Sequence, residues 1–140
     1  MRMIGLAALM LGSAAIHGCT MDDGHAVAMH DQSHGRAEAG LRQALAGYAQ
    51  GATTSCVNSR DLEGNRSFGA NAILFEGTGD RFYLNRPGNC PVLGPGRTLQ
   101  VRSVGTQLCR GDIADVVDLS SRTTLGGCSL GDFTAYTRAR

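Results

Sequence analysis

Four cysteines downstream of residue 50 constrain the fold of this chain more than any other feature. Cys56, Cys90, Cys109 and Cys128 are separated by 34, 19 and 19 residues, and none forms a C-x-x-C pair with another. This spacing is unlike that of a zinc knuckle or a redox site, whereas an even number of cysteines in a small exported domain indicates two disulfides. Three pairings are possible. We favour Cys56–Cys128, which ties the start of the domain to its end, with Cys90–Cys109, which closes a local loop.

The N-terminus predicts export. Arg2 supplies a positive charge, and residues 4–16 form a mostly apolar run. A run of this length is too short to cross a bilayer as a helix, which takes about 20 residues, and it is typical of a secretory signal. Residues 16–19 (Ile-His-Gly-Cys) are similar to a lipobox, although His17 departs from the usual small or hydroxylated residue. We therefore predict a lipid on Cys19.

The lipid prediction implies a location. A bacterial lipoprotein cysteine typically carries three acyl chains, and several chains give a stable membrane anchor. Thr20 rather than Asp follows Cys19, so we expect the periplasmic face of the outer membrane in the cell envelope. The alternative is cleavage after the A-x-A pattern of residues 26–28, which would release a soluble periplasmic protein.

The chain divides into three parts: a signal peptide over residues 1–18, the lipidated cysteine with a flexible polar tether over 19–35, and one small domain over 36–140. With Arg2 in the signal, 12 Arg and no Lys remain against 12 acidic residues. A nucleic-acid partner would favour a basic excess, so we expect none. The membrane is the expected partner, together with an envelope protein.

Three histidines lie in the predicted tether. His25, His30 and His34 stand near Met21 and Met29, and imidazole suits copper, nickel and zinc. A metal-handling protein is therefore one alternative. Because a flexible tether does not preorganise ligands, we favour a solvated linker with no metal and no cofactor.

The domain itself is predicted to be mainly β, a small antiparallel sheet or partly closed barrel with one N-terminal helix and two disulfides. An apolar stripe of helical period predicts the helix over residues 36–50. Residues 71–85 predict a hairpin in which Ile73 pairs with Leu84 and Phe75 with Phe82, all on one face. Further strands are expected at 56–59, 98–104, 113–119 and 133–136, and loops at 87–91 and 93–96.

Several short segments resemble a known family. They are Cys56-Val57, residues 72–75 (Ala-Ile-Leu-Phe), 83–85 (Tyr-Leu-Asn), 89–94 (Asn-Cys-Pro-Val-Leu-Gly), 108–113 (Leu-Cys-Arg-Gly-Asp-Ile) and 128–133 (Cys-Ser-Leu-Gly-Asp-Phe). This pattern is similar to that of small exported proteobacterial domains with four cysteines and no known function. The resemblance implies a disulfide-stapled β domain and no catalytic residues.

The residues indicate a binding or structural role rather than catalysis. From Arg36 onward the chain has no His, which removes the commonest general acid–base side chain. Asp112, Asp115 and Asp118 recur every three residues, but no EF-hand spacing accompanies them, and we expect solvated strand positions. We therefore expect a lipid-anchored, non-enzymatic envelope protein. The other alternative is an inhibitor or accessory subunit of an envelope enzyme that docks through residues 86–96.

The lipid prediction is testable by mass spectrometry of the purified protein. Cys19→Ser should block lipid attachment and leave the precursor uncleaved, because the lipoprotein peptidase acts on the acylated cysteine. A wild-type chain that begins at Met29 and carries no acyl mass would contradict the prediction.

Overall fold

The structure, a computed structural model, describes residues 23–88, 90–102 and 105–140, with side chains from Val27 onward. The predicted signal peptide of residues 1–18 and the predicted lipid site Cys19 lie outside the described residues. Within them, one α-helix precedes ten strands and a single 3-10 turn over Ser59–Asp61. The elements are α1 (Asp23–Ala44), β1 (Tyr48–Thr54), β2 (Cys56–Asn58), β3 (Leu62–Phe68), β4 (Ala72–Gly77), β5 (Arg81–Asn85), β6 (Arg97–Val101), β7 (Gln107–Cys109), β8 (Ile113–Asp118), β9 (Thr124–Ser129) and β10 (Phe133–Arg138).

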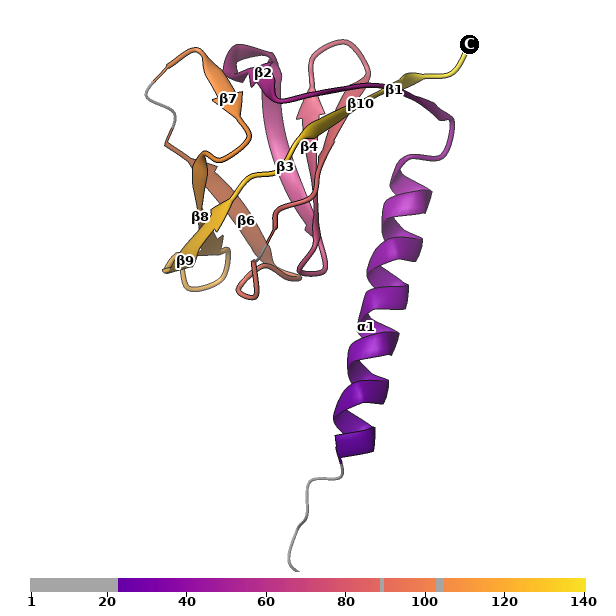
Figure 1. Ribbon diagram of the computed structural model, residues 1–140, viewed down its shortest axis with the longest axis vertical. Coiled ribbons are helices and arrows are strands. Elements are labelled where there is room, and N and C mark those ends of the chain that lie inside the picture. Colours follow the sequence, from indigo (N-terminus) through magenta and orange to yellow (C-terminus); the bar gives the residue numbers. More distant parts are fainter. Residues whose placement is uncertain (1–22, 89, 103–104) are drawn as a thin grey trace, which may run out of the picture.

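The strands are antiparallel, as expected, but they form three sheets rather than one small sheet. The largest has the order β1-β10-β5-β4-β3, the second pairs β2 with β7, and the third has the order β6-β8-β9. Helix α1 lies outside the strands along one face of the five-stranded sheet (Figure 1). The predicted class, mainly β with one N-terminal helix and two disulfides, is confirmed, and the described strands form no closed barrel.

The five-stranded sheet is covered on both faces, which gives the domain two hydrophobic cores. The larger core lies between this sheet and the two smaller sheets, around Ile73, Phe75 and Phe133. The smaller core lies between the opposite face and α1, around Leu41, Leu74 and Leu84. Since alternate residues of a strand point to opposite faces, the run 72–75 supplies both cores and is buried throughout.

The hairpin forms where the sequence predicts it, but its predicted register is wrong by one residue. Phe75 pairs with Tyr83 and Ile73 with Asn85, rather than with Phe82 and Leu84. The turn has three residues between Gly77 and Arg81, and Gly79 and Asp80 both have positive φ. A shift of one residue moves every side chain of a strand to the other face. Phe82 and Leu84 therefore lie on the α1 side.

The helix begins and ends earlier than the predicted range 36–50. It starts at Asp23 and ends at Ala44, so residues 23–35 are helical although their polarity indicated a tether. The predicted apolar stripe does face the sheet: Leu41 is buried, and Ala44 and Leu45 pack on the smaller core. The stop falls near Gly47, whose φ of +81° suits glycine, and the chain turns into β1.

Both disulfides form, but the favoured pairing is wrong. The bonds join Cys56 to Cys109 and Cys90 to Cys128. Cys56 on β2 lies directly opposite Cys109 on β7, with 4.0 Å between their Cα atoms. Cys128 is on β9, in the three-stranded sheet, and it is the later strand β10 that returns to pair with β1. The start of the domain thus meets its end through a sheet and not through Cys56–Cys128.

Two asparagine side chains of the five-stranded sheet bond to the backbone of neighbouring segments. Asn65 bonds to β6, and Asn85 bonds to the bend between β9 and β10. Asn65 on β3 donates to the carbonyl of Leu99 on β6 and accepts from the backbone N–H of Leu99, both at 2.9 Å. The fully buried Asn85 donates to the carbonyl of Gly131 at 2.8 Å and accepts from the Gly131 N–H at 2.9 Å. Each amide therefore replaces a pair of ladder hydrogen bonds. A Cβ on Gly131 would overlap the carbonyl oxygen of Arg86, so glycine is required at this approach.

The Asn85 contact predicts a large loss of stability on truncation. Asn85→Ala leaves the N–H and the C=O of Gly131 without their partner, and each orphaned group costs about 1–3 kcal/mol when water cannot replace it. Urea unfolding should show this decrease, whereas the exposed Asn71→Ala should change the free energy of unfolding by no more than about 0.5 kcal/mol. Equal midpoints for the two variants would show that water satisfies Gly131.

Candidate functional site

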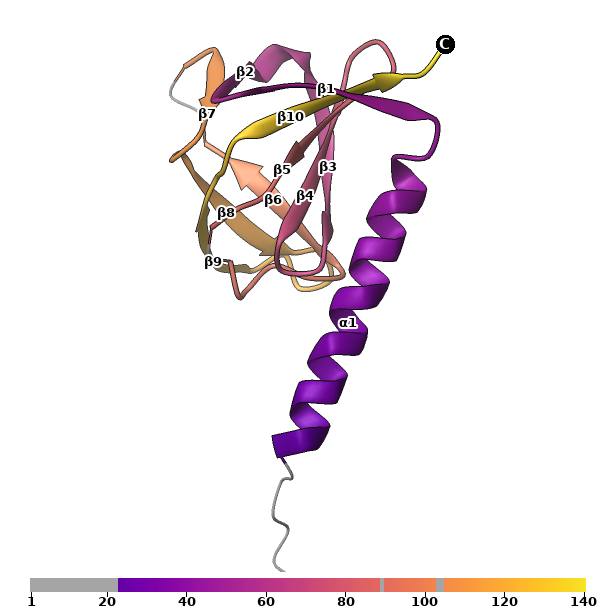
Figure 2. The same cartoon turned by 45° about the vertical axis from the view of Figure 1, so that its right-hand side comes forward.

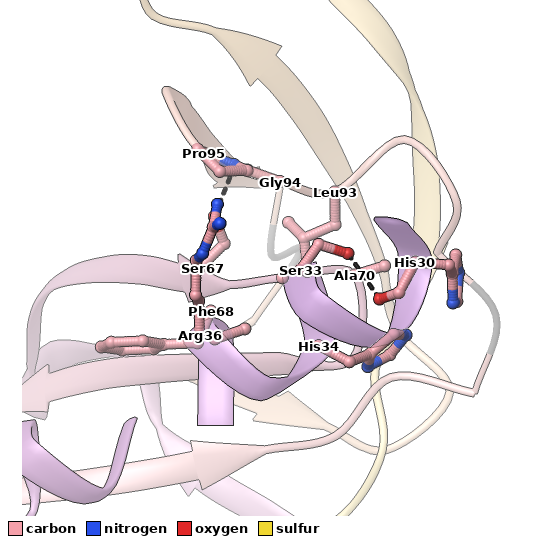
Figure 3. A pocket seen from close by; sticks show the side chains of 12 residues that line it. His30, Ser33, His34, Arg36, Ser67, Phe68, Ala70, Leu93, Gly94 and Pro95 are labelled. Carbon is pink, nitrogen blue, oxygen red and sulfur yellow. Dashed lines mark hydrogen bonds between the residues drawn. The ribbon is translucent and has the colours of Figure 1, made fainter. Parts of the chain in front are cut away.

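A groove between α1 and the β domain is the candidate functional site. It has a volume of about 540 Å³, within the range of about 300–1,000 Å³ that is usual for small-molecule sites. Its walls come from α1, from the turn between β3 and β4, and from the loop before β6 (Figure 3). The lining residues are His30, Ser33, His34, Arg36, Ala37, Ser67, Phe68, Gly69, Ala70, Leu93, Gly94 and Pro95.

Local contacts hold the walls in place. The Ser67 hydroxyl on β3 donates to the carbonyls of Gly94 and Arg97, at 2.8 and 3.2 Å, and the Arg97 guanidinium donates to the carbonyl of Val92. These bonds fix the loop of residues 92–97 against β3. On the other wall, Gly69 has a positive φ, and a Cβ there would come within 3.0 Å of Ala37. The absence of a side chain at Gly69 lets α1 approach the turn.

The groove combines an apolar floor with a cationic and imidazole rim. Phe68, Leu93 and Pro95 supply apolar surface from the β domain, and the polar side chains come mostly from α1. In Figure 3 the imidazoles of His30 and His34 lie on one side of the groove and the Phe68 ring on the other. The lining residues include Arg36 but no carboxylate. The arrangement therefore suits a ligand that is partly apolar or electron-donating.

An ion pair between Glu38 on α1 and Arg86, the residue after β5, holds the helix against the β domain. The Arg86 guanidinium donates two hydrogen bonds to the Glu38 carboxylate, at 3.0 and 3.3 Å. The hydrogen bond from Arg86 is the main reason why the pKa of Glu38 lies below its usual value. Desolvation opposes this shift, and the nearby charges of Arg86, Arg42 and His34 add to it. Because both side chains are about half exposed, this pair orients α1 more than it stabilises the fold.

The predicted metal candidates have a different setting from the one expected. His30 and His34 lie on α1, and their ring centroids are 4.6 Å apart, so the reason for excluding them, a flexible tether, does not hold at these positions. The side chain of His25 lies outside the described residues. No group of three or more His, Cys, Asp or Glu side chains in the described part of the chain is placed to hold a metal ion.

The three aspartates with a spacing of three residues do not act together. Asp112 accepts from the backbone N–H of Cys109 at 2.8 Å, Asp115 pairs with Arg102 at 3.2 Å, and Asp118 binds the turn that follows β8. Each carboxylate thus has its own structural partner. Asp115 and Asp118 lie on β8, as expected, whereas Asp112 precedes this strand, and all three residues are partly buried rather than fully solvated.

Three other carboxylates line a small pocket at the β4–β5 turn. This pocket, of about 290 Å³, contains Glu76 and Asp80 together with Glu63. Glu76 pairs with Arg66 at 3.7 Å and Asp80 with Arg138 at 3.1 Å. The two carboxylates therefore stand in one pocket but have separate counterions.

The loop of residues 86–96, expected as a docking surface, is partly buried and partly exposed. Pro87, Cys90, Leu93 and Gly94 are buried, while the exposed residues are Arg86, Gly88, Pro91, Pro95 and Gly96. The Cys90–Cys128 disulfide ties this loop to β9. Leu93, Gly94 and Pro95 of this loop also form one wall of the groove.

The groove was not found from the sequence. Its walls come from three segments, and Phe68, Ala70 and Leu93 belong to no motif that would connect them. One available signal was the spacing of four between His30 and His34, which places both on one face of any helix.

Among the described residues, no helix is long and apolar enough to span a membrane.

Comparison of the chain with protein-family models, with curated proteins and with solved structures finds no match to any of them.

The Asp118 turn generates a pH-dependent prediction. Its Oδ1 accepts from the Ser120 hydroxyl and from the N–H groups of Ser120 and Ser121. The Ser120 hydroxyl, followed by the N–H groups of Ser121 and Ser120, lowers the pKa of Asp118 to about 2. Because the pKa of Asp118 is lower in the folded state than in the unfolded state, the charged carboxylate stabilises the fold at pH values above the ordinary aspartate pKa of about 3.9. This contribution disappears as the pH falls toward 2.

Asp118→Ala should therefore melt at a lower temperature than wild type at pH 7, and the gap should narrow between about pH 4 and pH 2. Thermal unfolding followed by circular dichroism at a series of pH values measures it. Asp118→Asn keeps an acceptor oxygen without the charge, so its difference from wild type should be smaller at neutral pH. A gap for Asp118→Ala that stays constant down to pH 2 would mean that the turn does not depend on the charge.

Proposed function

We propose that this protein is a lipid-anchored, non-enzymatic envelope protein with a binding or structural role. The signal-like N-terminus and the lipobox-like residues 16–19 support attachment through Cys19, at the periplasmic face of the outer membrane. The observation that carries the proposal is the position of α1, which begins four residues after Cys19 and ends against the β domain.

Helix α1 has the shape of a spacer. Its 22 residues extend for about 33 Å at a rise of 1.5 Å per residue. The last turns pack on the sheet through Leu41, Ala44 and Leu45, while residues 27–33 are exposed. The first turns project beyond the β domain in both views (Figures 1 and 2). A helix held at one end in this way keeps the domain at a distance from the surface to which Cys19 is attached.

The groove supports a binding role. It opens beside the helix, it is shaped by hydrogen bonds from Ser67 and Arg97, and it offers apolar contact together with two imidazoles. The carboxylates of Glu76, Asp115 and Asp80 are engaged separately with Arg66, Arg102 and Arg138, and that of Asp112 with the backbone. These contacts favour ligand binding over turnover.

A second function, accessory subunit or inhibitor of an envelope enzyme, is favoured by strand β1. This strand lies at one edge of the five-stranded sheet, and six of its seven residues, Tyr48–Thr54, are exposed. It has no charged residue and no proline, two of the features that protect an edge from pairing, and its pairing with β10 shifts register between Gln50 and Thr53. An extended segment of a partner could add to such an edge.

Chemical cross-linking in intact cells, followed by capture, tests the binding role. Ala70→Trp fills the groove, and Ala39→Trp is the matched control because Ala39 is exposed on α1 and does not line the groove. A cross-linked product that is present in wild type and Ala39→Trp but absent in Ala70→Trp supports binding at the groove. Equal products in all three would place the contact elsewhere, with β1 as the next surface to mutate.

A further inference from the structure

The imidazoles of His30 and His34 form a geometric pair on α1. They are four residues apart, and their ring centroids are separated by 4.6 Å. Of the three residues between them, Asp31, Gln32 and Ser33, the last donates its hydroxyl to the carbonyl of His30 at 2.7 Å. We propose that His30 and His34 together chelate one divalent transition-metal ion, of the zinc, nickel or copper class, at the rim of the groove.

The spacing is the one that a helical chelate requires. Residues four apart on a helix have Cβ atoms about 5–6 Å apart on the same face. Two histidines at this spacing bind one zinc ion in helical H-x-x-x-H motifs, with a metal–nitrogen distance of about 2.0–2.1 Å. His30 is exposed and His34 partly exposed, so both rings can rotate to direct a nitrogen at a shared ion. Imidazole is a good ligand for zinc, copper and nickel.

The helix changes the energetic case for this site. In a flexible segment, metal binding must first order the backbone between the two ligands, which costs conformational entropy for each residue fixed. In α1 the three intervening residues, 31–33, are already helical. The chelate therefore forms on a backbone that is arranged before the ion arrives, and the ion in turn stabilises this turn of the helix.

The surroundings determine what else the ion can take. The described residues provide no group of three His, Cys, Asp or Glu ligands, and the lining of the groove contains no carboxylate. Two protein nitrogens leave further coordination positions for water or for a donor atom of a molecule in the groove. With Arg36 nearby, the bound ion favours an anionic or electron-donating ligand at those positions. This inference does not depend on lipid attachment, because it rests on α1 alone.

Isothermal titration of the oxidised full chain with Zn²⁺, Ni²⁺ and Cu²⁺ tests the site. The chain carries Cys19→Ser, which removes the fifth cysteine as a competing ligand, and is kept in mild detergent. Binding of one equivalent is expected. His30→Gln and His34→Gln should each lower the metal affinity. Loss of an outer-shell partner of a metal ligand lowers affinity by roughly 10–100-fold, and loss of a ligand should lower it by at least as much. His25→Gln should change the affinity little.

A spacing variant separates the chelate from adventitious histidine binding. His34→Gln combined with Gly35→His keeps the number of histidines but places the second one five residues from His30, off the shared face. The variant should lose the one-equivalent site. Addition of metal should also increase the helical circular dichroism signal of wild type but not that of the double variant His30→Gln/His34→Gln. The spectrum of the double variant without metal shows whether its helix is intact. Unchanged binding in the spacing or double variant, or no binding in wild type, would overturn the proposal.

Discussion

The architecture depends on one constraint, the burial of both faces of strand β4. Ala72, Ile73, Leu74 and Phe75 are consecutive and all buried, so their side chains alternate between two cores. A single sheet with one solvated face cannot accommodate such a run. The two smaller sheets cover Ile73 and Phe75, and α1 covers Leu74. Complete burial of a Leu, Ile or Phe side chain contributes about 1.5–3 kcal/mol, so removing either cover would expose a substantial share of the apolar surface that stabilises the domain.

Side chains and disulfides complete the connections that strand pairing leaves open. Asn65 joins β3 to β6 and Asn85 joins β5 to the bend after β9, each through a pair of hydrogen bonds to the backbone. The two disulfides tie β2 to β7 and the 86–96 loop to β9. Aromatic contact between Phe75 and Phe133 fills the space that these links enclose. A small domain with few aromatic residues therefore uses several specific polar and covalent links around a modest core.

The position of α1 connects the fold to both proposals. The last turns of α1 belong to the smaller core. Its first turns project beyond the β domain (Figure 2), and between the two ends His30 and His34 line the groove. The same helix thus serves as a spacer and as one wall of a binding site. A ligand that fills the groove would stabilise the contact between α1 and the β domain, since the walls of the groove come from both.

The sequence by itself determined the class of the fold, the site of the β4–β5 hairpin, the apolar stripe at Leu41 and the formation of two disulfides, because these follow from local periodicity, turn residues and cysteine number. Tertiary structure alone decided the hairpin register, since both faces of β4 are apolar and a shift of one residue leaves the hydrophobic pattern equally satisfied. It also decided the cysteine pairing, which depends on β2 meeting β7 across 53 residues of chain. The groove belongs to this second group, because residues such as Phe68 and Leu93 meet the helix through long-range packing that no local pattern contains.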